Sequence, residues 1–400
     1  TPEEIDGINK KEVWEEILTY KSVHSLPSSA ESIRNAVNSL VRSSYILEGA
    51  DGKPPLKTYL QHRVDGEDEI FFIVNSDRED KREYVLTIKN AGGRKIFVLD
   101  AVNGRVYETD VLKTFDEALT YRFILAPAGS ILLILSNSSK YTGRKEKKFL
   151  DIGKAKVIHL PDVFQFERKD ANVLVLDRIS VSYDGRNFEK EELEWRVRKN
   201  VAEYFGTSDA LQWQPWVAIK KGLFDGRGGD IVLRYKFCSD IKSPECYLVI
   251  EDMQKGRVSV NGIEVPVVNN NLAWHWDRSF KKLEITEYVK KGENIVDFRV
   301  KYDFLTEVES AYVVGDFGVK MVSPYRGEIV QEARTIKTGS LVEQGYPFYS
   351  GRMVYKTEFD LNACKKKVYL RLVNPSGILF NLRINSRDAG QILWRPYITE

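Results

Sequence analysis

The spacing of hydrophobic residues divides the chain into a short helical start and a long β-rich remainder. Up to residue 57, apolar positions recur every three or four residues, which is typical of one face of a helix. They are Val13, Ile17 and Leu18 in a first stretch, and Ile33, Val37, Leu40 and Val41 after the helix-start signal Pro27-Ser28-Ser29. Beyond residue 57 apolar and polar residues alternate, as they do in strands. We therefore predict a mainly β protein with a short helical N-terminal segment (1–57), the tail of a preceding domain.

Residues 58–140 hold a series of strand-like runs at the spacing expected of a small antiparallel β-sandwich. Turn signals separate the runs, among them Asp65-Gly66, Gly92-Gly93 and Asn103-Gly104. Glycine, asparagine and aspartate are frequent in turns because they tolerate a positive φ angle. The predicted strands are Tyr59–Arg63, Glu69–Asn75, Glu83–Lys89, Arg94–Asp100, Val106–Asp110, Thr120–Leu125 and Ser130–Ser136.

Residues 150–325 have the layout of a jelly-roll sandwich with flanking strands and one helical patch near 189–205. The most informative stretch is GRVSVNGIEV at 256–265, because Asn-Gly between alternating apolar residues is a strong signal for a two-residue hairpin. An aromatic loop follows, then the sequence YVKKGEN at 288–294 with a turn of helix, and a last apolar strand up to Val300. This order of elements predicts a jelly roll.

Part of that layout returns in residues 326–400. The corresponding stretches are Val354–Phe359 with Leu233–Phe237, Val368–Val373 with Cys246–Glu251, and Phe380–Asn385 with Val258–Asn261. Asn385-Ser386 is a weaker hairpin turn of the same kind. Because the helical turn and the last strand of the first copy have no counterpart before Glu400, we predict a second, truncated jelly roll and a natural chain that continues.

Composition excludes some classes of function. The 60 basic and 58 acidic residues nearly cancel to a net charge of +2, whereas nucleic-acid surfaces need a clustered positive excess. No apolar run approaches the roughly 18 to 20 residues that span a bilayer, so no membrane partner is predicted. Lysine and glutamate dominate the charged 30% of the chain, as in proteins of thermophiles. Thr1 is not a natural start, so localisation stays open between extracellular, periplasmic and cytoplasmic.

The cysteines and histidines show no metal-ligand spacing. Of the three cysteines, Cys238 and Cys246 leave a disulfide across a loop as an alternative to free thiols, and Cys364 is left over. The four histidines are scattered. We predict no metal site and no cofactor. Calcium is commonly held in such sandwiches, but the acidic residues are too dispersed to assign it a site.

Several short motifs occur in a fixed order along the chain. They are YLQHR (59–63), EIFFIVN (69–75), LDAVNG (99–104), VNG (260–262), AYVVGDFGV (311–319) and GYPFYSGRMVYKTEF (345–359). Together they resemble the C-terminal half of bacterial α-L-rhamnosidase-like glycoside hydrolases, a family 106-like group with family 2-type sugar-binding jelly-roll domains. The resemblance implies galactose-binding-like sandwiches packed around a catalytic (β/α) barrel with paired acidic residues. This sequence shows no barrel, so no catalytic residue is carried over.

Paired carboxylates have a simpler interpretation here than catalysis. Glycoside hydrolysis needs two carboxylates at a set distance in one concave site. Glu307 and Glu309 lie two residues apart and share one face of a strand. We expect them to pair with neighbouring lysine or arginine side chains.

Two aromatic clusters fit the chemistry of sugar recognition, in which flat rings cover the C–H side of a pyranose and polar groups bind its hydroxyls. The predicted ligand-binding residues are Trp274, His275, Trp276 and Asp277, with Trp213 and Trp216 as companions, and Tyr346, Tyr349 and Arg352. An alternative for both clusters is that the rings plug the end of a sandwich and contact a neighbouring domain.

The expected function is that of a non-catalytic C-terminal region of a large glycoside hydrolase in polysaccharide degradation, which supports the catalytic barrel and binds carbohydrate. The partners would then be carbohydrate and the neighbouring catalytic domain of the same chain. Two alternatives are a free-standing carbohydrate-binding protein and a purely structural docking region. Whether the chain acts as an enzyme is left open, because function must be argued from a site rather than from a fold.

Overall fold

The chain folds into two compact units, which are described separately. The computed structural model describes residues 4–5, 8–9, 11–41, 43–101, 104–109, 111–113, 117–141, 144–145, 156–208, 214–222, 226–267, 273–361, 368–395 and 397–399. The first unit combines Thr1–Lys156 with Leu361–Glu400, and the second is Val157–Asp360. Both are built mainly from antiparallel sheets, and no barrel occurs in the described residues, which confirms the predicted fold class.

The N-terminal segment contains the predicted helices α1 (Lys11–Ile17) and α2 (Ala30–Leu40), preceded by the short strands β1 (Glu4–Ile5) and β2 (Ile8–Asn9). Helix α2 begins at Ser29, whose side chain accepts a hydrogen bond from the backbone N–H of Ser32. Its apolar stripe is not buried, since Ile33 and Val37 are 53% and 51% exposed. The helix is therefore amphipathic but presents its apolar face to solvent.

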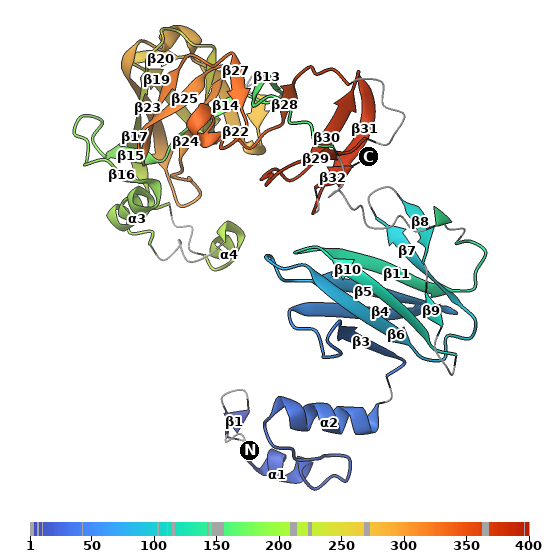
Figure 1. The fold of residues 1–400 in the computed structure, drawn as a ribbon. Coiled ribbons are helices and arrows are strands. Elements are labelled where there is room, and N and C mark those ends of the chain that lie inside the picture. Colours follow the sequence, from blue (N-terminus) through green and yellow to red (C-terminus); the bar gives the residue numbers. More distant parts are fainter. Residues whose placement is uncertain are drawn as a thin grey trace. The chain divides into compact units, whose positions relative to one another are not determined.

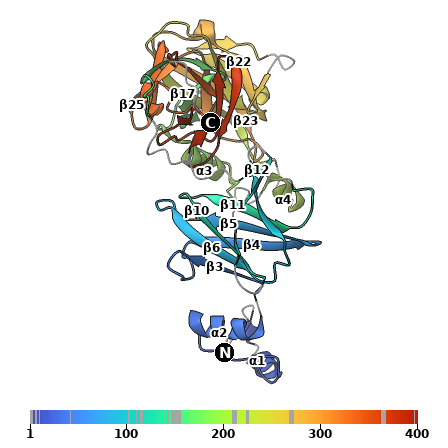
Figure 2. The ribbon, with the colours of Figure 1, turned by 45° about the vertical axis from the view of Figure 1, so that its right-hand side comes forward.

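Two sheets form the sandwich of the first unit, and they lie as face-to-face layers (Figures 1 and 2). The four-stranded sheet has the order β3 (Tyr45–Gly49), β6 (Arg82–Ile88), β10 (Leu119–Leu125), β9 (Leu112–Lys113). The six-stranded sheet has the order β12 (Arg144–Lys145), β8 (Arg105–Glu108), β7 (Lys95–Asp100), β11 (Ser130–Ser136), β5 (Asp68–Asn75), β4 (Thr58–Asp65). Every strand predicted between residues 58 and 140 is present.

Strand β3 is an addition to the predicted sandwich. Tyr45–Gly49 pairs with β6 although it lies in the segment predicted to be helical. Tyr45 and Leu47 pack against the core that Phe71, Tyr84 and Leu133 form between the sheets. The alternation of apolar residues is too short in this stretch to identify a strand from sequence, and the contact with β6 determines its conformation.

The C-terminal part of the first unit consists of short strand pairs. Strand β29 (Leu370–Arg371) pairs with β32 (Ile398–Thr399), and β30 (Phe380–Ile384) pairs with β31 (Arg387–Ile392). The turn between β30 and β31 has positive φ angles of 49° at Asn385 and 65° at Ser386. The second predicted hairpin is thus confirmed.

The second unit is a larger β-sandwich. Its five-stranded sheet has the order β14 (Asn172–Leu176), β24 (Ala311–Gly315), β18 (Cys246–Glu251), β22 (Asp277–Glu284), β21 (Ala273–His275). The eight-stranded sheet has the order β16 (Glu192–Leu193), β15 (Arg178–Ser182), β17 (Gly229–Ser239), β23 (Gly292–Tyr302), β19 (Gly256–Val260), β20 (Ile263–Val265), with β26 (Arg326–Val330) joining β17 and β25 (Gly318–Ser323) joining β26.

Smaller elements surround these two sheets. A three-stranded sheet has the order β27 (Thr335–Lys337), β13 (Val163–Arg168), β28 (Met353–Lys356). The helices are α3 (Glu194–Tyr204), which falls in the predicted helical patch, α4 (Pro215–Lys220), and the 3-10 turns η3 (Met253–Lys255), η4 (Thr286–Tyr288) and η5 (Val342–Gln344).

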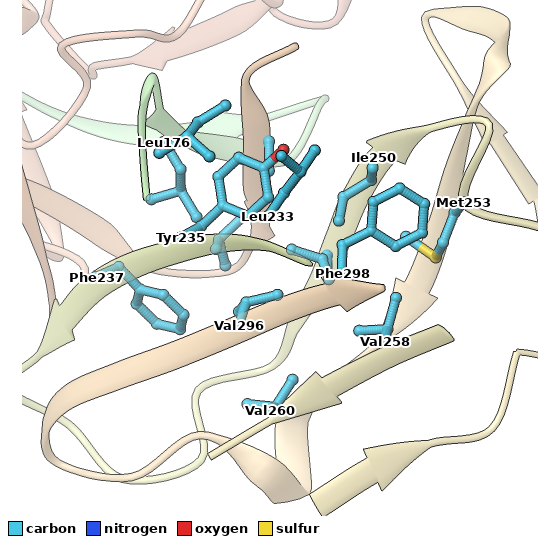
Figure 3. Packing of buried hydrophobic residues seen from close by; sticks show 14 of the residues in the cluster. Leu176, Leu233, Tyr235, Phe237, Ile250, Met253, Val258, Val260, Val296 and Phe298 are labelled. Carbon is cyan, nitrogen blue, oxygen red and sulfur yellow. The ribbon is translucent and has the colours of Figure 1, made fainter. Parts of the chain in front are cut away.

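The core of the second unit lies between its two main sheets (Figure 3). The register brings Phe298 of β23 opposite Leu233 of β17 and Val258 of β19. All three are at most 2% exposed, and Leu248 of the other sheet packs into the same layer. Alternate residues of β23 point to the outside, so one strand supplies both the core and a charged surface.

Hydrogen bonds join the Asn-Gly turn to the sequence KGEN at 291–294. Asn261 and Gly262 have φ angles of 54° and 82°, as a tight hairpin turn requires. The side-chain amide of Asn261 donates to the carbonyl of Tyr288 and to Oδ1 of Asn294, both at 2.9 Å. Asn294 is fully buried and donates in turn to the carbonyls of Lys290 and Gly292. The motifs thus satisfy each other's buried polar groups.

Phe298→Ala is expected to destabilise the second unit by about 3 to 5 kcal/mol, because it removes a buried ring and leaves a cavity. Unfolding in urea followed by tryptophan fluorescence measures the loss. Phe298→Leu keeps most of the apolar volume and should lose less. A loss below about 1 kcal/mol for the alanine variant would contradict the central place of Phe298 in this core.

Candidate functional site

The outer face of the five-stranded sheet carries aromatic rings over a floor of valines. Val173, Val249 and Val314 come from three neighbouring strands and are at most 4% exposed. The partly buried rings that pack on them belong to Tyr247, Phe280 and Tyr312. Such a surface is unusual for the outside of a sandwich, where alternation normally places polar side chains.

Trp276 extends this face at the corner between β21 and β22. It sits alone between the paired residues His275 and Asp277, in a left-handed conformation with φ of 61°. This conformation is costly for a bulky residue, and such strain often occurs at functional sites. The indole is 54% exposed, and its ring meets that of Tyr312 edge-on at a centroid distance of 5.3 Å.

We call Trp276, Phe280 and Tyr312 the aromatic corner. Phe280 also packs against Tyr312, with ring centroids 5.8 Å apart and planes at 71°. Tyr312 therefore contacts both of the other rings. Both contacts are edge-to-face, which is a favourable arrangement for aromatic pairs.

Asp277 fixes the turn that presents Trp276. Its Oδ1 accepts hydrogen bonds from the backbone N–H and the hydroxyl of Ser279, at 2.9 and 2.8 Å. These bonds, the backbone one first, lower the pKa of the Asp277 carboxyl from its ordinary value. The side chain therefore stays ionised and holds the backbone of the hairpin.

Carboxyl groups lie at the edge of the aromatic corner. Glu251 ends β18, pairs in register with Phe280, and shares a hydrogen bond with Ser279. Burial raises the pKa of Glu251, and the nearby charges of Glu307 and Glu309 raise it further. Burial likewise raises the pKa of Glu309. A half-buried carboxyl beside an aromatic ring can both accept and donate a hydrogen bond near its pKa.

Arg198 of α3 pairs with both Glu307 and Glu309, the two carboxylates that share one face of a strand. Its guanidinium lies 2.9 Å from Glu307 Oε2 and 3.3 Å from Glu309 Oε1. The oxygen of Glu307 is buried, and the contact attracts by charge without the alignment of a hydrogen bond. The prediction that these two glutamates pair with a basic neighbour is confirmed.

The second predicted aromatic cluster is held in place by hydrogen bonds to other residues of the second unit. Tyr346 is 2% exposed, and its hydroxyl donates to Glu332 at 2.9 Å. The hydroxyl of Tyr349 donates to the carbonyl of Arg352, and the N–H of Arg352 donates to Asp170 at 2.8 Å. The guanidinium of Arg352 lies 3.7 Å from the carboxylate of Asp170 in a loose ion pair, and 82% of its side chain is exposed.

The remaining predicted residues are placed as follows. Trp274 and His275 belong to β21, but their side chains lie outside the described part of the structure, and so does all of Trp213. Trp216 is on α4 and 67% exposed. The structure brings Trp276 and Asp277 together with Tyr312 and Phe280, which the sequence did not single out. Each is the single aromatic residue of its strand, Tyr312 in Ala311–Gly315 and Phe280 in Asp277–Glu284, and the sequence gives no sign that the two rings meet.

The structure decides the state of the two cysteines that were considered for a disulfide. Cys238 and Cys246 are free thiols, so the alternative of a disulfide between them is wrong. Burial raises the pKa of Cys246 to about 12, which makes it inert.

Among the described residues, no group of three or more histidine, cysteine, aspartate or glutamate side chains could hold a metal ion. In the same part of the chain, no helix is long and apolar enough to cross a membrane.

No protein-family model matches this chain, and neither does any curated protein. Among solved structures, it is similar to a rhamnosidase from Novosphingobium sp. PP1Y, with 17% identity, coverage of 69% of this chain and 22% of that one, and a TM-score of 0.23. A β-porphyranase of glycoside hydrolase family 86 from Bacteroides plebeius matches with 15% identity, coverage of 65% and 36%, and a TM-score of 0.17. The enzyme BuGH86 in complex with neoagarooctaose matches with 12% identity, coverage of 65% and 34%, and a TM-score of 0.17.

All three solved proteins are glycoside hydrolases, of whose length this chain spans 22% to 36%. The TM-scores are too low for the likeness to carry an argument about this chain. Its function is therefore inferred from the geometry of its own residues.

Glu251→Gln is expected to make the protein more stable than the wild type as the pH rises from about 4 to 7. A carboxyl whose pKa is raised in the folded state stabilises the fold below its ordinary pKa and loses that contribution as the pH rises through the folded value. The glutamine variant has no such loss. Urea unfolding midpoints at both pH values measure the difference.

Glu284→Gln is the control for this comparison, because it removes an exposed carboxyl from the same face of the sheet. If both variants changed stability equally at each pH, the effect would come from net charge and not from burial of Glu251.

Proposed function

We propose that this chain is a non-catalytic β-sandwich region of a carbohydrate-active protein, and that the aromatic corner of its second unit binds sugar. The parent protein would be an α-L-rhamnosidase-like glycoside hydrolase that acts on heteropolysaccharides. The observation that carries the proposal is Trp276, exposed and held in a strained turn against Tyr312 beside half-buried carboxyls.

The corner combines the two kinds of groups that sugar recognition needs. A pyranose presents a flat C–H face, which gains from contact with an exposed ring, and a rim of hydroxyls, which needs directed hydrogen-bond partners. Trp276 offers such a ring, and Tyr312 stops it from turning away. Glu251 stands beside Phe280 with a carboxyl able to bond a hydroxyl group.

Several features support a role without catalysis. Glycoside hydrolysis requires one carboxylic acid and one free carboxylate flanking the scissile bond. Glu307 and Glu309 instead share the guanidinium of Arg198, at 2.9 and 3.3 Å, in a structural ion-pair network. The order of the short motifs, from YLQHR to GYPFYSGRMVYKTEF, supports a relation to the rhamnosidase-like enzymes and thus a catalytic barrel elsewhere in the parent protein.

One observation favours the alternative of a structural docking region. Helix α2 presents Ile33, Val37 and Leu40 to solvent, and Leu40 is 74% exposed. An apolar helix face of this kind is suited to packing on a neighbouring domain. This role concerns the first unit and is compatible with sugar binding by the second. A free-standing sugar-binding protein would use the same corner.

Trp276→Ala is expected to weaken binding of heteropolysaccharide fragments about tenfold or more, since it removes the ring on which the sugar would lie. Titration calorimetry with rhamnose- and galactose-containing oligosaccharides measures the change. Trp195→Ala is the matched control, because Trp195 lies on α3 of the same unit and is 53% exposed against 54% for Trp276.

Two results would argue against sugar binding at this corner. One is that the wild-type chain binds none of the oligosaccharides. The other is that Trp276→Ala and Trp195→Ala bind equally well. If Trp276→Ala loses its cooperative unfolding, Trp276→Phe, which keeps a ring, decides between a lost contact and a lost fold.

A further inference from the structure

The outer face of the eight-stranded sheet contains two arginines directly opposite each other. Arg257 of β19 and Arg299 of β23 are register partners, so their side chains leave the same face of the sheet side by side. Both are exposed. Like charges in this position repel and destabilise the strand pair by roughly 0.2 to 1 kcal/mol. The pair therefore requires an explanation.

The neighbouring charges on the same face are compensated. Arg234 of β17 forms a two-pronged ion pair with Asp297 of β23, with bonds of 2.7 and 2.9 Å, and its guanidinium stacks on the ring of Phe188. No ion pair in the described part of the chain involves Arg257 or Arg299. Arg234 thus has an ion-pair partner, whereas Arg257 and Arg299 have none.

The loop after β15 positions one of the two guanidiniums. Gly185 has φ of 72°, and a Cβ built there would lie 3.2 Å from Nη1 of Arg299. The loop is held by Asp184, whose carboxylate accepts from the backbone N–H groups of Arg186 and Asn187. The oxygens of Asp184 accept hydrogen bonds from Ser182, Arg186 and Asn187, and Asp184 forms no ion pair with Arg299.

We propose that Arg257 and Arg299 bind the anionic group, sulfate or carboxylate, of an acidic glycan. An oxyanion between two guanidiniums would accept charge-assisted hydrogen bonds from both and would remove their repulsion. The proposal rests on the proposed function for the class of ligand. A nucleic acid is a poorer fit, because the chain has a net charge of only +2 and the pair is an isolated positive site.

Binding of matched oligosaccharides to the whole chain tests the proposal. The probes are a sulfated galactan oligosaccharide, the same oligosaccharide after desulfation, and a galacturonan oligosaccharide, each measured by calorimetry at low salt. We expect one of the two charged probes to bind at least tenfold more tightly than the neutral one. The better charged probe identifies the anion as sulfate or carboxylate.

Variants assign that preference to the two arginines. Arg257→Gln with Arg299→Gln should abolish the preference for the charged probe. Lys236→Gln, which removes an exposed cation from the same face of β17, should keep it. Equal binding of charged and neutral probes by the wild type, or a preference that survives in the double variant, would overturn the proposal.

A second measurement separates this proposal from sugar binding at the aromatic corner. Inorganic sulfate alone should raise the melting temperature of the wild type, relative to an equal ionic strength of chloride, by more than it raises that of the double variant, because sulfate also stabilises proteins without binding to a site. This difference without binding of any oligosaccharide would support the anion site and refute the proposed function. An equal rise in both proteins would refute the anion site.

Stability without ligand gives a third readout. At low salt, Arg257→Gln should unfold at the same urea concentration as the wild type or a higher one, since it relieves repulsion. A clear loss of stability would show that Arg257 has a structural role, and would contradict the proposal.

Discussion

The buried layer between the two main sheets of the second unit is the constraint on which its surfaces depend. Once Phe298, Leu233 and Leu248 are committed to this layer, the pleat of each strand determines which residues face outward. A shift of one residue in the register of β23 would bury Asp297 and Arg299 and expose Phe298. The chemistry available on either surface is therefore a consequence of how the core is packed.

The two outward faces have opposite character. The five-stranded sheet presents aromatic rings on valines, with Trp276 raised at its corner, whereas the eight-stranded sheet presents charged side chains, including Arg257 and Arg299. A rigid sheet holds such groups more precisely than a loop does. An acidic glycan would meet flat rings on one surface and paired guanidiniums on the other, so the two proposed sites need not act on the same part of a ligand.

Electrostatic pairing distinguishes groups that hold the structure from groups that are available. Arg198 forms ion pairs with Glu307 and Glu309, and Asp297 forms one with Arg234. In the second aromatic cluster, Tyr346 is likewise structural, because it is buried and its hydroxyl donates to Glu332. The proposed ligand-binding groups are different: the indole of Trp276 is 54% exposed, and no ion pair in the described part of the chain involves Arg257 or Arg299.

The sequence alone determined the local elements, because they depend on neighbours along the chain. Alternation identified the strands from Tyr59 to Ser136, Asn261-Gly262 and Asn385-Ser386 identified both hairpins, and spacing identified α1 and α2. The sequence alone could not reveal β3, whose conformation depends on pairing with β6. Nor could it reveal the hydrogen bond between the side chains of Asn261 and Asn294. Only the tertiary structure decided which rings join Trp276 and that Arg257 faces Arg299, since those contacts join strands far apart in the chain and depend on register.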